Sequence, residues 1–189
     1  MVLVIFMANF AAMTVEPTLT LFLQSLHVPE GSLELHAGVV FAATGLASFL
    51  AAPWLGKLGD SYGHRLILSW SLAGATAVYF LQGLVTAPWH LAVLRFLLGL
   101  GVRGIVPAAN AVIAQMIPAQ RRGRGFGWTL SANFWGNVVG PLTGSVIASS
   151  FDSQRAVFPV TALIMLLNLG WLLLRVPRRL PDAAAVTGE

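Results

Sequence analysis

Charged residues are scarce in this sequence. Asp, Glu, Lys and Arg make up 10% of its 189 residues, whereas a soluble domain carries roughly 25%. Hydrophobic residues make up 57%, and the mean hydropathy is +0.78. So few polar side chains cannot cover a water-soluble globule, and the composition therefore indicates an integral membrane protein. Cysteine is absent, which excludes a disulfide framework and a thiolate metal site.

What the sequence has instead is a series of long apolar runs. Most are about 20 residues or longer, enough for a helix to cross a bilayer core of about 30 Å. The runs are continuous instead of alternating, which favours helices. We therefore predict an all-α integral membrane protein in which residues 1–175 form one transmembrane domain. Its six spans are expected at about 2–26, 36–55, 66–87, 91–117, 125–150 and 157–174. Residues 176–189 are polar and broken by proline, which predicts a disordered tail.

The basic residues fall mainly in short loops. The net charge of +4 and the pI near 10.7 could indicate a nucleic-acid partner, but this distribution favours a membrane orientation signal. Eight basic residues fall on one side of the predicted spans, and Arg155 is the only one in a loop on the opposite side. The eight are Lys57, Arg65, Arg121, Arg122, Arg124, Arg175, Arg178 and Arg179. Under the positive-inside rule, we predict that this side and both termini are cytoplasmic, with the lipid bilayer and no nucleic acid as partner.

The first span contains a carboxylate at membrane depth, Glu16. It shares a helical face with Asn9 and precedes Pro17, which favours a kink. A carboxylate in this position is costly, so it normally faces a cavity or a partner. We interpret Asn9 and Glu16 as part of a cavity that binds substrate or a proton. The alternative is a carboxylate near the outer surface that snorkels or pairs with an arginine.

The fourth span carries two arginines. Arg103 lies near mid-span and shares a face with Asn110, so we assign both to the same cavity. Arg95 lies closer to the outer edge, where a long side chain can snorkel to the surface. A guanidinium stays charged at this depth and needs a carboxylate, carbonyls or water. Glu16 with Arg103 or Arg95 is therefore the natural candidate pair.

A polar stretch, Gly56–Arg65, separates the second and third spans. Gly59 and Gly63 suit a tight turn, and Asp60 can accept hydrogen bonds at a helix N-terminus or pair with Arg65. The alternative is a solvated loop that only orients the chain. We favour a cytoplasmic gate loop, formed by Gly56, Asp60, Gly63 and Arg65.

The fifth span carries a strip of small residues that would let another helix pack closely. Asn133 and Asn137 add a polar row that faces a pore or bonds to a neighbouring helix. The strip reads G-x-x-x-G-P-x-x-G and is formed by Gly136, Gly140, Pro141 and Gly144.

Three signatures occur in a consistent order. The first is G-x-L-x-D-x-x-G-x-R at 56–65, the second is L-x-x-x-R-x-x-x-G-x-G at 91–101, and the third is the glycine-proline strip. Together they resemble one six-helix half of the major facilitator superfamily, in its drug:proton antiporter branch, over nearly the whole chain. GKLGD, LRFLLG, GNVVGPLTG and RAVFPVTA look more like the C-terminal half of a bacterial multidrug efflux pump. Ser61 and His64 depart from the family pattern, which implies a softer charge latch.

The resemblance implies a multi-pass protein of the bacterial inner membrane, whose six spans form two inverted three-helix repeats. Spans one and four would line a central cavity, and span five would pack against another half. Small-molecule substrate and protons would meet Asn9, Glu16, Arg103 and Asn110. The expected partner is a missing N-terminal six-helix half or a second copy of the chain, since the apolar run begins almost at Met1.

The expected function is therefore proton-coupled efflux of drug-like or amphipathic molecules by alternating access. One alternative is a six-span fragment or scaffold that transports nothing. Another is a sugar or metabolite transporter on the same fold. We expect no enzymatic activity, no metal and no cofactor, because the four histidines lie at loops or span edges without metal-ligand spacing.

Overall fold

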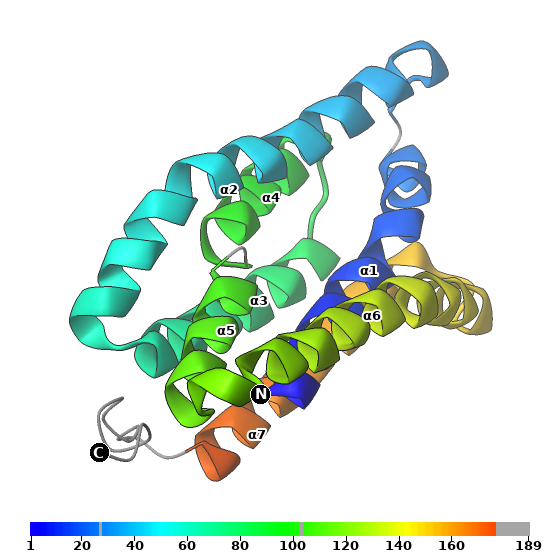
Figure 1. Ribbon diagram of the computed structural model, residues 1–189. Helices are drawn as coiled ribbons and strands as arrows, with labels where there is room; N and C mark the ends of the chain where they lie inside the picture. The colour runs from blue at the N-terminus through cyan, green and yellow to red at the C-terminus, as the bar shows by residue number, and fades with distance from the viewer. Residues whose placement is uncertain (27, 103, 177–189) are drawn as a thin grey trace.

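The computed structural model describes residues 1–26, 28–102 and 104–176, and within these ranges it contains helices and no strand (Figure 1). The long helices are α1 (Val2–Ser25), α2 (Leu33–Tyr62), α3 (His64–Gly83), α4 (Pro88–Val102), α5 (Ile105–Met116), α6 (Arg122–Ser150) and α7 (Val157–Arg175). Three short 3-10 turns precede α2, α6 and α7: η1 (Glu30–Ser32), η2 (Ala119–Arg121) and η3 (Gln154–Ala156). The prediction of a tail at 176–189 falls almost wholly outside the described residues.

Five stretches of the described residues are long and apolar enough to cross a membrane: Val2–Ser25, Leu33–Tyr62, His64–Gly83, Pro88–Met116 and Gln154–Arg175. The remaining span is the fifth, α6, and it has the length, because 29 residues extend about 43 Å at 1.5 Å per residue. Its glycines, asparagines and arginines make it less apolar than the others. The molecule is thus a six-span helical bundle, as predicted, with α4 and α5 together forming the fourth span.

The packing of the helices shows the internal symmetry of two three-helix repeats. α1 packs along α6, α2 along α4, and α3 along α7. If the first three spans are exchanged for the last three, the α1–α6 pair maps onto the α2–α4 pair, and the α3–α7 pair maps onto itself. This pattern is the one expected for inverted repeats related by a pseudo-two-fold axis.

Glycines allow the closest of these helix contacts. A Cβ added at Gly136 would lie 2.8 Å from the backbone nitrogen of Phe10, and one at Gly140 would lie 2.6 Å from the Cβ of Met13. At Gly144 an added Cβ would overlap the carbonyl oxygen of Thr14. The glycine strip therefore packs on α1 within this chain, so this face of the fifth span is not free to meet another half. The span was predicted to pack against another half, and for its glycine face this prediction was wrong.

The stretch between the second and third spans is mostly helical, so the prediction of a loop here was wrong. α2 continues to Tyr62 and α3 begins at His64. Only Gly63 interrupts the helices, and its φ of 92° lies in the region that favours glycine. The polar residues of this stretch did not end α2, because Lys57 is compatible with a helix and a helix can continue beyond the apolar layer.

Candidate functional site

A cavity of about 360 Å³ opens between the helices of the bundle. Every span except α7 contributes to its wall. Most of the lining is apolar or small, and the polar part comes from α1, α2, α3, α4 and α6. The polar lining residues are Asn9, Glu16, Thr44, Ser48, Tyr79, Arg95 and Asn133. A largely apolar pocket with a few convergent polar groups is the usual form of a small-molecule site.

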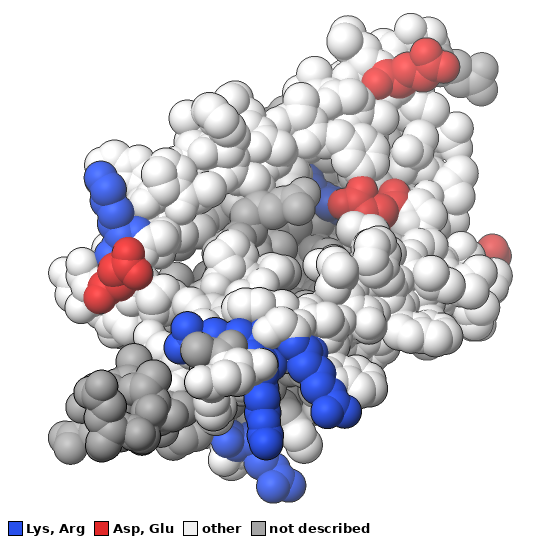
Figure 2. All heavy atoms as spheres, viewed as in Figure 1, with Lys and Arg blue, Asp and Glu red and all other residues white. Residues whose placement is uncertain are grey.

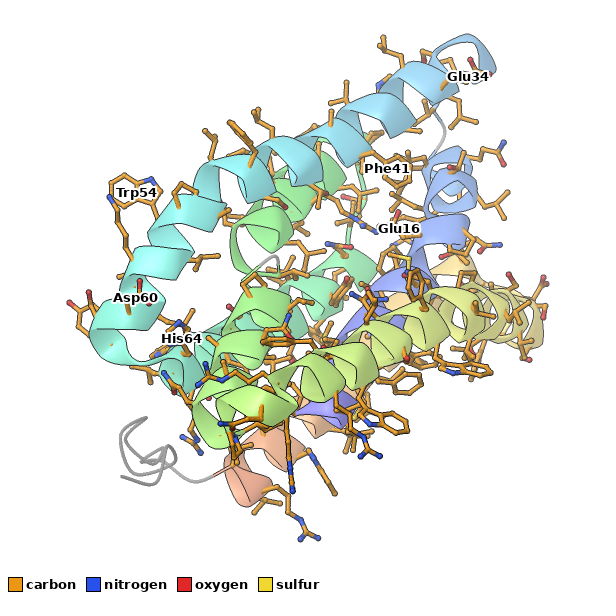
Figure 3. The ribbon with its side chains drawn as sticks, viewed as in Figure 1. Glu16, Glu34, Phe41, Trp54, Asp60 and His64 are labelled. Carbon is orange, nitrogen blue, oxygen red and sulfur yellow. The ribbon has the colours of Figure 1, made fainter. Side chains whose placement is uncertain are left out.

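Glu16 and Arg95 form an ion pair across this cavity. The Nη1 atom of Arg95 lies 3.6 Å from the Oε1 atom of Glu16. The Arg95 side chain is 2% exposed, whereas that of Glu16 is 35% exposed. Figure 3 shows Glu16 pointing from α1 into the space that α2 covers, and Figure 2 shows acidic and basic atoms together in a hollow of the surface. A buried guanidinium and a partly open carboxylate thus bring opposite charges together in the middle of the bundle.

The expectation that Arg95 snorkels to the outer edge of the membrane was wrong. The whole residue is 1% exposed, so Arg95 lies in the interior of the bundle. α4, which carries it, packs against α2. The packing is close at Gly99, where an added Cβ would overlap the carbonyl oxygen of Thr44. The hydroxyl of Ser48 donates to the carbonyl of Gly99 at 3.2 Å. These contacts hold α4 with the Arg95 face turned toward the cavity.

Asn9 lies at the boundary between the cavity and the α1–α6 contact. Its Nδ2 atom donates to the carbonyl of Asn133 at 2.7 Å and to the Oδ1 atom of Asn137 at 2.8 Å. Of the two readings of the asparagine row on α6, hydrogen bonding to a neighbouring helix is therefore the one observed for Asn137. Asn133 accepts the other bond from Asn9 through its backbone carbonyl and also lines the cavity.

Of the remaining two residues assigned to the cavity, the structure describes Asn110 alone, and it is not found there. Asn110 lies on α5, outside the cavity wall, and its Oδ1 atom is buried without a hydrogen-bond partner among the described residues. Arg103 lies outside the described residues, so its assignment stays a prediction. Sequence reasoning missed Thr44, Ser48 and Tyr79. Tyr79 is one of two tyrosines and lies well inside an apolar span, which is the signal that could have identified it.

At the α2–α3 turn, Asp60 pairs with a different residue from the one predicted. Its Oδ1 atom lies 3.5 Å from the Nε2 atom of His64 (Figure 3). An added Cβ at Gly59 would lie 3.0 Å from the Cδ2 atom of His64, so the missing side chain leaves room for this ring. Arg65 instead donates to backbone carbonyls at the end of α7, from Nε to Val176 at 2.9 Å and from Nη2 to Leu173 at 3.4 Å.

The Arg65 contacts join the start of α3 to the end of α7. The last carbonyls of a helix lack intrahelical partners, and a basic side chain there also meets the negative end of the helix dipole. Basic side chains gather over the same end of the molecule in Figure 2. The predicted gate loop is thus a compact junction of three helix ends.

The comparison with known families assigns the fold. The sequence pattern of the family described as "Major Facilitator Superfamily" matches residues 1–189. The chain belongs to the major facilitator superfamily. The match agrees with the two three-helix repeats, since inverted 3+3 repeats build each six-helix half of these transporters.

Individual relatives support the same assignment. The chain is 34% identical to the "Multi-drug resistance efflux pump PmrA homolog" of Lactococcus lactis, over 88% of this chain and 41% of that protein. It is 40% identical to the "Uncharacterized MFS-type transporter YuxJ" of Bacillus subtilis, over 80% and 38%. It is 36% identical to the "Multidrug resistance protein MdtG" of Serratia proteamaculans, over 92% and 43%. The chain therefore spans about 40% of the length of the curated relatives it matches.

Proposed function

We propose that this chain forms one half of a transporter that exports drug-like or amphipathic small molecules in exchange for protons, by alternating access. One observation carries the proposal: Glu16 and Arg95 form an ion pair in a cavity among membrane-spanning helices. Ionisable residues at this depth are costly and mark substrate or proton routes by default. Membership of the superfamily and relatives named as multidrug efflux proteins support the same reading.

Glu16 is the proton site in this proposal. Its carboxylate is partly open to the cavity, so a proton can reach it, whereas Arg95 is almost fully buried and keeps its charge. Protonation removes the negative charge of Glu16 and with it the electrostatic attraction between α1 and α4. The attraction between α1 and α4 therefore depends on whether Glu16 is protonated.

The turn around Gly63 acts as the inner gate in this proposal. Asp60 and His64 are close to each other there, and Arg65 ties the turn to the end of α7. The basic side chains at this end of the molecule support a cytoplasmic position for it under the positive-inside rule, and we assign both termini to the same side. The matched relatives are more than twice as long as this chain, which supports a companion six-helix half or a second copy.

Transport measured in liposomes tests the proposal. The chain is reconstituted with and without a first-half partner, and dye efflux is followed against an imposed pH gradient. We expect gradient-driven efflux with the partner. Glu16→Gln should reduce this efflux at least about tenfold, the scale of losing one charge-assisted contact of about 1.4 kcal/mol. Glu34→Gln, at an exposed position outside the cavity, should leave it unchanged.

Two results would contradict this function. Dye movement that does not depend on the pH gradient would remove proton coupling. Unchanged efflux in Glu16→Gln, with unchanged helix content, would show that the proton site is not Glu16.

A further inference from the structure

Arg95 has more hydrogen-bonding capacity than its surroundings satisfy. Among the described residues, neither its Nε atom nor its Nη2 atom has a hydrogen-bond partner, although both atoms are buried. The third nitrogen, Nη1, lies 3.6 Å from Glu16, which is too long for a hydrogen bond. A guanidinium carries five N–H donors in a rigid fork. Arg95 is thus a buried cation whose donors are mostly unmatched.

The arrangement is unfavourable for a purely structural arginine. Leaving a buried donor without an acceptor costs free energy, and more so when the group is charged. A structural ion pair at this depth would be expected in close, bidentate geometry, because only then is the loss of water offset. The pair observed here has one long contact, which leaves Arg95 available to a better acceptor.

The cavity gives a small molecule access to Arg95. Arg95 lines its wall, and Glu16 and Arg95 are the Asp, Glu, Lys or Arg residues among the described lining residues. α4 ends and α5 begins beside the cavity, so a negative and a positive helix end lie there together and largely offset each other. Among the described lining residues, the charge that a ligand meets is therefore set by the Arg95 and Glu16 side chains.

We infer that Arg95 is the anchoring site for a carboxylate or similar planar anionic group of the transported molecule, and that Glu16 occupies this site in the absence of ligand. This inference rests on the proposed function and specifies the substrate class of the same cavity. A ligand carboxylate that replaces Glu16 can approach the Nη1 edge and, with a small turn of the guanidinium, also accept from Nη2. Bidentate contact of this kind is the geometry that selects arginine over lysine.

A binding experiment separates this inference from transport. Equilibrium dialysis is performed on the 189-residue chain in nanodiscs of neutral lipid, without any gradient. The two probes are 2-naphthoate and 2-naphthamide, which share size and shape but differ in charge. In Glu16→Gln the competing carboxylate is gone, so naphthoate should bind about tenfold or more tightly than in the unchanged chain. Naphthamide should bind about equally to both.

Variants of Arg95 complete the test. Arg95→Gln should abolish the preference for naphthoate over naphthamide, and Arg95→Lys, which keeps the charge without the fork, should retain only part of it. The controls Glu34→Gln and Arg124→Gln change exposed residues of the same types. Circular dichroism checks that each variant is helical, and if Arg95→Gln does not fold, Arg95→Lys and Glu16→Gln decide the question.

The outcomes are distinct from those of the efflux assay. Equal binding of the two probes to Glu16→Gln, or a naphthoate preference that survives in Arg95→Gln or is complete in Arg95→Lys, would overturn the inference. A chain that binds naphthoate as expected but moves no dye would keep the anchoring site and remove the export function. Proton-driven efflux without any naphthoate preference would do the reverse.

Discussion

Replacing Gly136 with alanine tests whether the glycine strip holds α1 and α6 together. An added Cβ would lie 2.8 Å from the backbone nitrogen of Phe10, and ordinary contact begins at 3.4 Å, so the helices must separate by about 0.6 Å. A backbone atom cannot rotate out of the way as a side chain can. The same separation would lengthen the hydrogen bonds from Asn9 to Asn133 and Asn137, now 2.7 and 2.8 Å, to about 3.3 and 3.4 Å, where such bonds weaken.

The expected loss is about 1–3 kcal/mol, the usual cost of adding a methylene-sized group to a packed interior. Alanine has a higher helix propensity than glycine by about 1 kcal/mol, which offsets part of this loss. Gly136 is a cleaner test than Gly140, because Gly140 precedes Pro141, and proline by itself restricts the residue before it.

The control is Gly127→Ala on the same helix. A Cβ at Gly127 meets nothing within 4 Å, so only the propensity term applies and stability should be unchanged or slightly higher. Both variants are unfolded by SDS titration in bicelles, with helix content followed by circular dichroism. If Gly136→Ala were as stable as Gly127→Ala, the close α1–α6 contact would not exist in the membrane.

Two further predictions concern the α2–α3 turn. Gly63→Ala should destabilise the chain by about 1–3 kcal/mol, because a φ of 92° is strained for a residue with a Cβ. The control Gly56→Ala changes an open helical site and should not destabilise the chain. Equal midpoints of SDS unfolding for the two variants would contradict the turn geometry. Arg65→Gln should speed hydrogen exchange in the last turn of α7 severalfold, because two terminal carbonyls lose their charged donor. Lys57→Gln removes an exposed charge from the same end of the molecule and should leave this exchange unchanged; a similar rise in both variants would point to charge alone.

The sequence predicts the helices of this protein well where an apolar run has a sharp end. The first span was predicted at 2–26 and the sixth at 157–174, and the structure has α1 at Val2–Ser25 and α7 at Val157–Arg175. In both, polar or proline-containing segments adjoin the run. The second span was predicted to end at 55, but α2 reaches Tyr62, because leaving the apolar layer does not require the helix to stop.

The partner of Glu16 shows what the sequence could not decide. Periodicity placed Arg103 at mid-span and Arg95 some 80° away around the same helix, so both remained candidates. The choice depends on how α4 is rotated, and this is fixed by close contact between Gly99 and the backbone at Thr44. This contact is not local in the sequence.

The contacts that join the helices differ in kind, and this difference bears on how the cavity could open. Close glycine contacts and hydrogen bonds hold α1 to α6 and α2 to α4, and separating either pair would break them. Among the described residues, the backbones of α1 and α4 do not pack closely, and the side chains of Glu16 and Arg95 bridge them at 3.6 Å. A long ion pair is sensitive to the charge of either partner, whereas glycine packing is not. If the proposed function holds, movement that opens the cavity is expected between the α1–α6 pair and the α2–α4 pair, and protonation or ligand binding at the ion pair would control it.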